Sequence, residues 1–338
     1  MKSLVAYRAR KIIARIKGLP DQPVDWQPLT PEDVETFRRL FPRPKFFIFG
    51  HARSGTTLLA RLVRLHPEVH CNWQGRFVTH YGDLLDLLTA RKVSDWLRHN
   101  SNHWGERISS EAILARAVIE FILESQALSA GKRVVGDKTP NLRNGEAVDR
   151  LHAVFPDAKL LFIVRDGRDT LVSLRLAEFI NRPHQLSVKG KRLRREFFRN
   201  PDAFITGRRS IFTEEWLRRL ALRWRENVLE THKKGQTHYG ANFMALRYEE
   251  LLVQPVRMMQ RVWNFLDVDP GGVTDELVQS EMKHNPNVDY RNEAAGEAAR
   301  CLPHGGPEAW KAFFTEADYR EFMRIAGQVM QAWGYVES

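Results

Sequence analysis

The chain has 338 residues, of which 43% are hydrophobic and 28% are charged, a composition that supports a buried core and excludes an intrinsically disordered protein. The formal net charge of +11 predicts an anionic partner. Cys71 and Cys301 are the only cysteines and lie far apart, which argues against a disulfide scaffold and for a reduced compartment. No apolar run approaches the roughly 20 residues of a membrane span, so we predict a cytoplasmic protein.

Residues 1–30 are predicted to form a basic amphipathic arm and a proline-punctuated linker. The first 19 residues are too charged for a signal peptide, because Arg10, Lys11 and Arg15 interrupt any apolar region. Leu4, Ile12 and Ile16 loosely share one helical face, a pattern typical of a surface helix. Docking on its own domain, contact with an anionic membrane and binding of an acidic partner are all compatible with this pattern. A peripheral contact at the inner membrane face is the functional prediction for the arm.

Strand and helix signals alternate along the rest of the chain. A helix is predicted from Pro31, capped by Thr30. The apolar run "KFFIFG" (45–50) predicts a buried parallel strand, and "GTTLLARLVRLHP" (55–67) predicts a helix. Further strand signals lie within 133–140, 158–169 and 242–252. This alternation predicts an α/β fold with a parallel sheet flanked by helices, so residues 31–338 are predicted to form one domain with helical insertions at about 75–130 and 175–240.

The stretch "FFIFGHARSGTT" (46–57) joins a predicted strand to a predicted helix, as a phosphate-binding loop does. Backbone N–H groups and the helix dipole favour an anion at such a helix N-terminus. Gly50 and Gly55 allow a tight turn close to a phosphate, and Ser54, Thr56 and Thr57 add hydroxyl donors. The stretch therefore predicts a phosphate site in a P-loop-like fold.

The loop lacks the lysine that a Walker loop uses to bind the β- and γ-phosphates of a nucleoside triphosphate. Thr56 stands in its place, which disfavours transfer of a γ-phosphoryl group. A ligand with a single 5′-phosphate fits the loop better. Arg53 is predicted to stabilise negative charge on a leaving phosphate oxygen.

The loop resembles that of sulfotransferases that use 3′-phosphoadenosine-5′-phosphosulfate (PAPS), which carry [K/R]-[S/T]-G-T-[T/S] after their first strand. A second family element, an arginine at a strand end and a serine eight residues later, is matched by Arg165 and Ser173 in "LLFIVRDGRDTLVS". The resemblance implies that these two residues bind the 3′-phosphate of the donor. A guanidinium at a strand end can itself grip a phosphate through two hydrogen bonds. A third element, R-Y-E-[D/E]-L, is matched by "LRYEELL", so Tyr248 is expected to border the nucleotide.

The resemblance covers roughly residues 44–336 and looks closest to the bacterial and Golgi-type carbohydrate and tyrosylprotein branches. It implies PAPS as co-substrate and no metal ion. The stretch from Gly305 to Tyr335 is similar to the family's closing segment, which covers the donor. Arg300 and Lys311 are candidates for basic residues of that segment.

Sulfuryl transfer requires an aligned acceptor hydroxyl, a group that takes its proton, and stabilisation of the leaving oxygen. Asp137, Lys138 and Thr139 resemble the E-K-[S/T] motif of heparan-type sulfotransferases, whose glutamate is the base. The resemblance implies Asp137 as base and Lys138 as a contact to the sulfuryl oxygens, at a strand end where α/β proteins place their sites. His51 and His80 are alternative bases. A structural role for Asp137, as a helix cap or an ion-pair partner of Lys138, also stays open.

The acceptor is less clearly defined by the sequence. Gln74 stands where the tyrosylprotein branch carries a glutamate, so that base is missing at this position. The basic stretch 182–209 favours an acidic glycan or glycolipid, with a solvated loop as the alternative. We therefore predict a PAPS-dependent O-sulfotransferase that acts on a carbohydrate or glycolipid hydroxyl and has no nucleic acid partner. The alternatives are a degenerate P-loop kinase or NTPase and a basic membrane-surface adaptor without catalysis.

Overall fold

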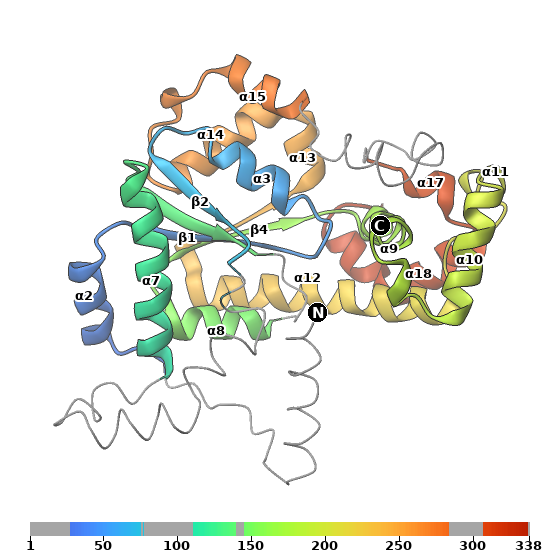
Figure 1. Cartoon of the computed structure of the whole chain (residues 1–338), viewed down its shortest axis with the longest axis horizontal. Coiled ribbons are helices and arrows are strands. Elements are labelled where there is room, and N and C mark those ends of the chain that lie inside the picture. Colours follow the sequence, from blue (N-terminus) through green and yellow to red (C-terminus); the bar gives the residue numbers. More distant parts are fainter. Residues whose placement is uncertain (1–27, 76, 78–110, 140–144, 284–306, 337–338) are drawn as a thin grey trace, which may run out of the picture.

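The computed structural model describes residues 28–75, 77, 111–139, 145–283 and 307–336. Its centre is a five-stranded sheet with the order β2-β3-β1-β4-β5 and parallel pairing throughout. The strands are β1 (Lys45–Gly50), β2 (Val69–Trp73), β3 (Val134–Lys138), β4 (Lys159–Val164) and β5 (Phe243–Arg247). Helices flank both faces of this sheet (Figure 1), which confirms the predicted α/β fold.

The sheet divides the apolar core into two parts because its central strands are buried on both faces. Phe46 and Ile48 of β1 pack on one side, whereas Phe47 and Phe49 pack on the other. The first side is covered by α3 (Thr56–Val63), α13 (Tyr248–Val253), α14 (Pro255–Phe265) and α15 (Asp275–Lys283). The second side is covered mainly by α7 (Glu111–Ser129), α8 (Glu146–Val154), α9 (Gly167–Asn181), α12 (Glu214–Tyr239) and α18 (Glu316–Ala332).

Shorter elements complete the described part of the chain. The helix α2 (Pro31–Leu40) begins as predicted, with Thr30 and Asp33 forming a capping box. At the far end of the molecule in Figure 1 lie α10 (Val188–Arg199), α11 (Asp202–Ile205) and α17 (Trp310–Phe313). Three short 3₁₀ helices are η1 (Pro183–Gln185), η2 (Gly240–Asn242) and η3 (Pro270–Gly272). None of the described helices is long and apolar enough to cross a membrane.

One element differs from the sequence prediction, and another rules out an alternative that the sequence left open. The edge strand β2 was not predicted, because its apolar Val69 and Cys71 alternate with polar residues over only five positions. Within 182–209, α10 is an ordered helix whose Phe197 is buried against Phe179 and Phe204, each 5.6 Å away between ring centres. The alternative of a solvated loop is therefore wrong. The N-terminal arm lies outside the described residues, so its separation from the domain stays a prediction.

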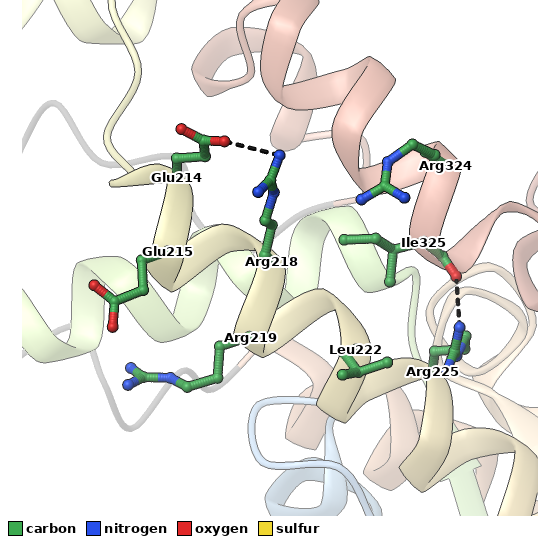
Figure 2. A pocket seen from close by; sticks show the side chains of 8 residues that line it. All are labelled: Glu214, Glu215, Arg218, Arg219, Leu222, Arg225, Arg324 and Ile325. Atoms are coloured by element: carbon green, nitrogen blue, oxygen red, sulfur yellow. Dashed lines mark hydrogen bonds and ion pairs between the residues drawn. The ribbon is translucent and has the colours of Figure 1, made fainter.

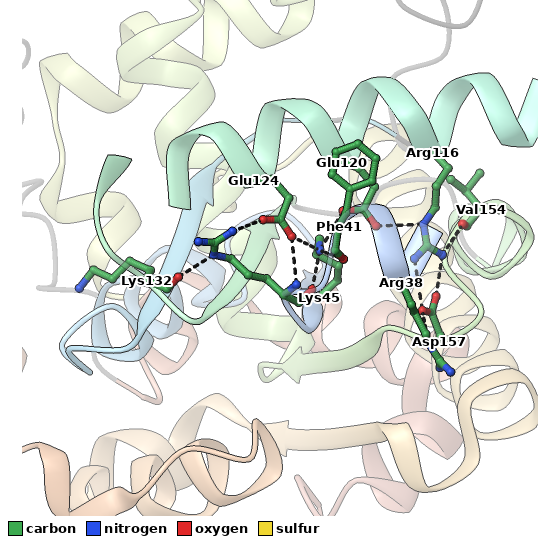
Figure 3. Close-up of polar contacts among 10 residues, drawn as sticks. Arg38, Phe41, Lys45, Arg116, Glu120, Glu124, Lys132, Val154 and Asp157 are labelled. Atoms are coloured by element: carbon green, nitrogen blue, oxygen red, sulfur yellow. Dashed lines mark hydrogen bonds and ion pairs between the residues drawn. The ribbon is translucent and has the colours of Figure 1, made fainter. Parts of the chain in front are cut away.

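A network of buried ion pairs lies at the amino ends of the strands (Figure 3). Lys45, at the start of β1, lies 2.8 Å from Glu120 and 2.8 Å from Glu124 of α7. Arg116 bonds the other oxygen of Glu120 at 3.0 Å and reaches Asp157 at 2.6 Å. The side chains of Lys45, Glu120 and Arg116 are only 4%, 0% and 2% exposed. Glu120 therefore compensates two buried cations at once.

Replacing Glu120 with alanine is expected to destabilise the fold strongly, because it leaves Lys45 and Arg116 buried without their shared partner. The expected loss is about 3–5 kcal/mol in the free energy of unfolding, measured by urea denaturation. Glu316→Ala is the control: Glu316 pairs with Arg320 in a solvent-exposed contact, and its loss is expected to cost about 0.5 kcal/mol. Equal losses in the two variants would contradict the role assigned to Glu120.

Candidate active site

The loop between β1 and α3 turns sharply at the carboxyl end of the central strand. The amide of Ser54 donates to the carbonyl of His51 at 3.0 Å. Arg53 and Gly55 both have left-handed backbones, with φ of +73° and +96°. A β-carbon on Gly55 would lie 2.3 Å from Cδ2 of Tyr248, so only glycine fits. The positive φ of Arg53 is unusual for a residue with a side chain and is typical of functional loops.

The predicted donor residues come together beside this loop. Nε of Arg53 donates to Oγ of Ser173 at 3.0 Å. Arg165 donates to the backbone carbonyl of Arg53 at 3.3 Å, and its guanidinium lies 4.8 Å from the ring centre of Tyr248. Residues from the loop, the end of β4, α9 and the start of α13 therefore form one cluster. The resemblance implied that Arg165, Ser173 and Tyr248 border the donor, and the structure brings them together with Arg53.

Lys138 approaches the same loop from β3. Its Nζ donates to Oγ1 of Thr57 at 3.2 Å and lies 4.7 Å from the ring centre of Trp73. The side chain is fully buried. The loop has no Walker lysine in its own sequence, yet a lysine from a neighbouring strand stands at the first turn of its helix. The fold therefore brings this lysine to the loop, so that a cation lies beside the N-terminus of α3.

Asp137 lies on the opposite face of the sheet from Lys138. Asp137 is in register with Phe47 and Lys138 with Ile48, and these two partners pack in different cores. The carboxylate of Asp137 accepts a hydrogen bond from the amide of Gly75 at 2.7 Å. It also accepts one from the hydroxyl of Thr139 at 2.5 Å.

Burial raises the pKa of the Asp137 carboxyl, and the hydrogen bonds from Thr139 and Gly75 oppose this shift. A higher pKa makes a carboxylate a better proton acceptor near neutral pH. The assignment of Asp137 as base remains a prediction.

The two histidines named as alternative bases differ in what the structure describes. His80 lies outside the described residues. His51 is buried, and its Nδ1 lies 3.0 Å from the carbonyl oxygen of Ala52. Since a carbonyl only accepts, Nδ1 carries the proton and Nε2 presents a lone pair. Burial lowers the pKa of His51 to about 4, so the imidazole is neutral at pH 7.

Two buried polar atoms of the loop have no hydrogen-bond partner within the described part of the chain. They are Nε2 of His51 and Oγ of Ser54. Buried polar atoms are nearly always hydrogen-bonded in proteins, so such atoms at a phosphate loop fit a site that is completed by a bound molecule. The described residues contain no group of three or more histidines, cysteines or acids that could hold a metal ion.

A separate depression of about 750 Å³ lies between α12 and α18 (Figure 2). Arg218 pairs there with Glu214 at 2.8 Å, and Arg225 donates to the carbonyl of Ile325 at 3.4 Å. None of the predicted site residues lines this depression. Its lining residues are Glu214, Glu215, Arg218, Arg219, Leu222, Arg225, Arg324 and Ile325.

The neutral state of His51 makes a testable contribution to stability. Its pKa in the folded protein lies below its ordinary value of 6.5. The folded state therefore binds fewer protons than the unfolded state between the two values, and this stabilisation is complete above pH 6.5 and is lost as the pH falls toward 4. In His51→Gln we expect the fall in unfolding free energy over this range to be smaller by about 3 kcal/mol, measured by urea denaturation at several pH values.

The matched control is His184→Gln, at an exposed histidine of η1. This variant should reproduce the pH profile of the wild type. If His51→Gln also kept the wild-type profile, another group would have to account for the loss of stability in acid.

Comparison with known proteins relates this arrangement to one family. Residues 44–195 match the family model described as the Sulfotransferase family. The protein-tyrosine sulfotransferase of Drosophila melanogaster is 27% identical over 244 residues, which cover 71% of this chain and 41% of that protein. Protein-tyrosine sulfotransferase A of Caenorhabditis elegans is 28% identical over 233 residues, covering 67% of this chain and 50% of that protein. The predicted resemblance to sulfotransferases is confirmed by these matches.

The chain matches about half the length, or less, of these curated relatives. Among solved structures, the sulfotransferase domain of the Synechococcus PCC 7002 olefin synthase is 16% identical. The match covers 91% of this chain and 97% of that one, with a TM-score of 0.49.

Proposed function

We propose that this protein is a PAPS-dependent sulfotransferase that transfers a sulfuryl group in line to a hydroxyl acceptor. The family match over residues 44–195 supports the reaction class. The observation that carries the proposal is the meeting of Lys138, Arg53 and Arg165 at one phosphate loop. Three cations around a helix N-terminus suit a donor with phosphates at two positions.

The donor would supply an activated sulfuryl group on its 5′-phosphate. The loop amides and Thr57 would hold that phosphate, and Arg165 with Ser173 would hold the 3′-phosphate. The unpartnered hydroxyl of Ser54 is consistent with a phosphate ligand at the loop. In the reaction the acceptor oxygen forms a bond to sulfur, the bond from sulfur to the phosphate oxygen breaks, and the acceptor proton passes to a base.

Lys138 and Arg53 differ in how they are placed for this step. Lys138 already lies at the first turn of α3, bonded to Thr57, and we assign it the charge on the sulfuryl oxygens. Arg53 is hydrogen-bonded to Ser173, the residue proposed to bind the other phosphate. A role for Arg53 at the leaving oxygen does not require that it give up this bond, because a guanidinium carries five N–H donors. Asp137 keeps the proposed role of general base.

The acceptor that we propose is a hydroxyl of a carbohydrate or glycolipid. Supporting it, α10 carries exposed cations that would attract an anionic acceptor, and only Glu196 within the helix opposes them. A protein tyrosine is the second candidate, because the two relatives above are named protein-tyrosine sulfotransferases. The exposed cations of the helix are Lys189, Lys191, Arg192, Arg195 and Arg199. A cytoplasmic location and a membrane contact through residues 1–30 are further parts of the proposal.

Calorimetric titration of 3′,5′-ADP in the presence of EDTA tests the donor site. We expect micromolar binding to the wild type. Arg165→Ala should bind about 10- to 100-fold more weakly, because it removes charge-assisted hydrogen bonds to a phosphate. Arg133→Ala, at an exposed arginine that pairs with Glu68, should bind like the wild type. Binding of ATP with Mg²⁺ in place of 3′,5′-ADP would support the kinase alternative instead.

Transfer from labelled PAPS tests the chemical step and the acceptor together. A panel of acidic glycans, glycolipids and tyrosyl peptides identifies which class is labelled by the wild type. On the acceptor found, Lys138→Met should lower kcat by about 10²–10³, whereas Lys132→Met, at a half-buried lysine just before β3 that bonds the carbonyl of Pro67, should not. A Lys138→Met enzyme with full kcat would remove Lys138 from the proposed mechanism.

A further inference from the structure

Asp169 is a buried carboxylate that neither the sequence motifs nor the proposed chemistry uses. It lies in the first turn of α9, four residues after Arg165 and four before Ser173, and is only 1% exposed. One oxygen accepts the amide of Trp310 at 2.8 Å, and the other accepts the amide of Glu308 at 2.8 Å. A helix that carries a proposed donor residue is thus bonded to the backbone of the C-terminal part of the chain.

The turn that Asp169 holds has an unusual backbone. Glu308 has a φ of +66°, a left-handed conformation that disfavours residues with side chains. Arg53 and Gln74, which flank the site, share this property. A strained turn persists only where its surroundings impose it, and the two hydrogen bonds of Asp169 are such a restraint.

A second contact attaches the same turn to α9. The guanidinium of Arg168 lies 4.0 Å from the ring centre of Trp310. Arg168 is itself bonded to Asp166 at 2.6 Å and to the carbonyl of Tyr335 at 3.1 Å. Trp310 also stacks on Tyr319 of α18, 5.5 Å away between ring centres. Consecutive residues of α9 therefore hold both the backbone and the side chain of this turn.

The charge of Asp169 is also coupled to the proposed donor site. Burial raises the pKa of Asp169 to about 6, Arg165 opposes this shift and Asp166 adds to it. The charge of Asp169 in turn contributes to raising the pKa of Tyr248, which is raised mainly by burial. The carboxylate that fixes the C-terminal turn thus interacts electrostatically with two residues of the donor cluster.

We propose that Asp169 is a positioning residue for the donor site, which clamps the Glu308–Trp310 turn to α9 and so holds residues 307–313 beside Arg165 and Ser173. Donor affinity then depends on Asp169 although Asp169 does not touch the donor. This inference rests on the proposed function. The Glu308–Trp310 turn would then contribute to donor binding because Asp169 and Arg168 hold it against α9.

The test combines ligand binding, kinetics and hydrogen–deuterium exchange on Asp169→Asn. The amide keeps the shape of the side chain but turns an N–H group toward one of the two backbone donors. We expect the Kd for 3′,5′-ADP and the KM for PAPS to rise about tenfold, the loss of one charge-assisted hydrogen bond, with kcat changed less than about threefold. Exchange in peptides covering 307–313 should become faster.

Asp318→Asn is the matched control. Asp318 is also a buried carboxylate of the C-terminal region, and it accepts the amide of Thr315 at 3.0 Å as part of the α18 cap. It makes none of the contacts described around Asp169. Its substitution should lower the unfolding free energy without changing the Kd for 3′,5′-ADP.

Three results would overturn the inference. The first is an unchanged Kd in Asp169→Asn while exchange in 307–313 accelerates. The second is an equal rise of Kd in Asp318→Asn, which would show a general loss of stability. The third is no slowing of exchange in 307–313 of the wild type on saturation with 3′,5′-ADP, a measurement that serves even if Asp169→Asn does not fold. Absence of any 3′,5′-ADP binding to the wild type would instead overturn the proposed function, and the donor link with it.

Discussion

The close approach of Tyr248 to Gly55 is the contact on which the rest of the site depends. The ring occupies the space that any larger residue at position 55 would need. The same ring lies against the guanidinium of Arg165, which in turn bonds the carbonyl of Arg53. Arg53 then reaches Ser173. A side chain at position 55 would therefore push Tyr248 away and disturb the contacts that link Tyr248, Arg165, Arg53 and Ser173.

Buried charges have different roles at the amino and carboxyl ends of the strands. At the N-terminal edge, Glu120 lies between Lys45 and Arg116, and each charge is compensated by its neighbours. At the carboxyl edge, Lys138 and Arg165 gather near a helix N-terminus, where positive charges add to the helix dipole. In the first arrangement the buried charges compensate one another, whereas the second leaves an excess of positive charge that suits an anionic ligand.

Buried carboxylates at the carboxyl edge organise backbone turns. Asp137 accepts the amide of Gly75 after β2, and Asp169 accepts two amides of the turn before α17. Burial raises the pKa of both carboxyls, and the accepted hydrogen bonds oppose that shift. Each carboxylate ties a segment remote in sequence to an element that carries site residues. These hydrogen bonds fix the backbone turns at the carboxyl ends of the strands without apolar packing.

The sequence by itself determined the features that depend on neighbours along the chain. The strand, loop and helix around Gly55, the position of Arg165 at a strand end and the capped start of α2 all follow from local spacing, periodicity and turn chemistry. The short strand β2 and the helix α10 were missed or left open because polar residues dilute their apolar patterns. Only the tertiary structure decided that Lys138 meets Thr57, that Asp137 faces the opposite core, and that Asp169 holds Glu308. Strand order and register set the first two contacts, and the docking of the C-terminal turn on α9 sets the third. All three arise from packing between segments far apart in the chain, which no local pattern encodes.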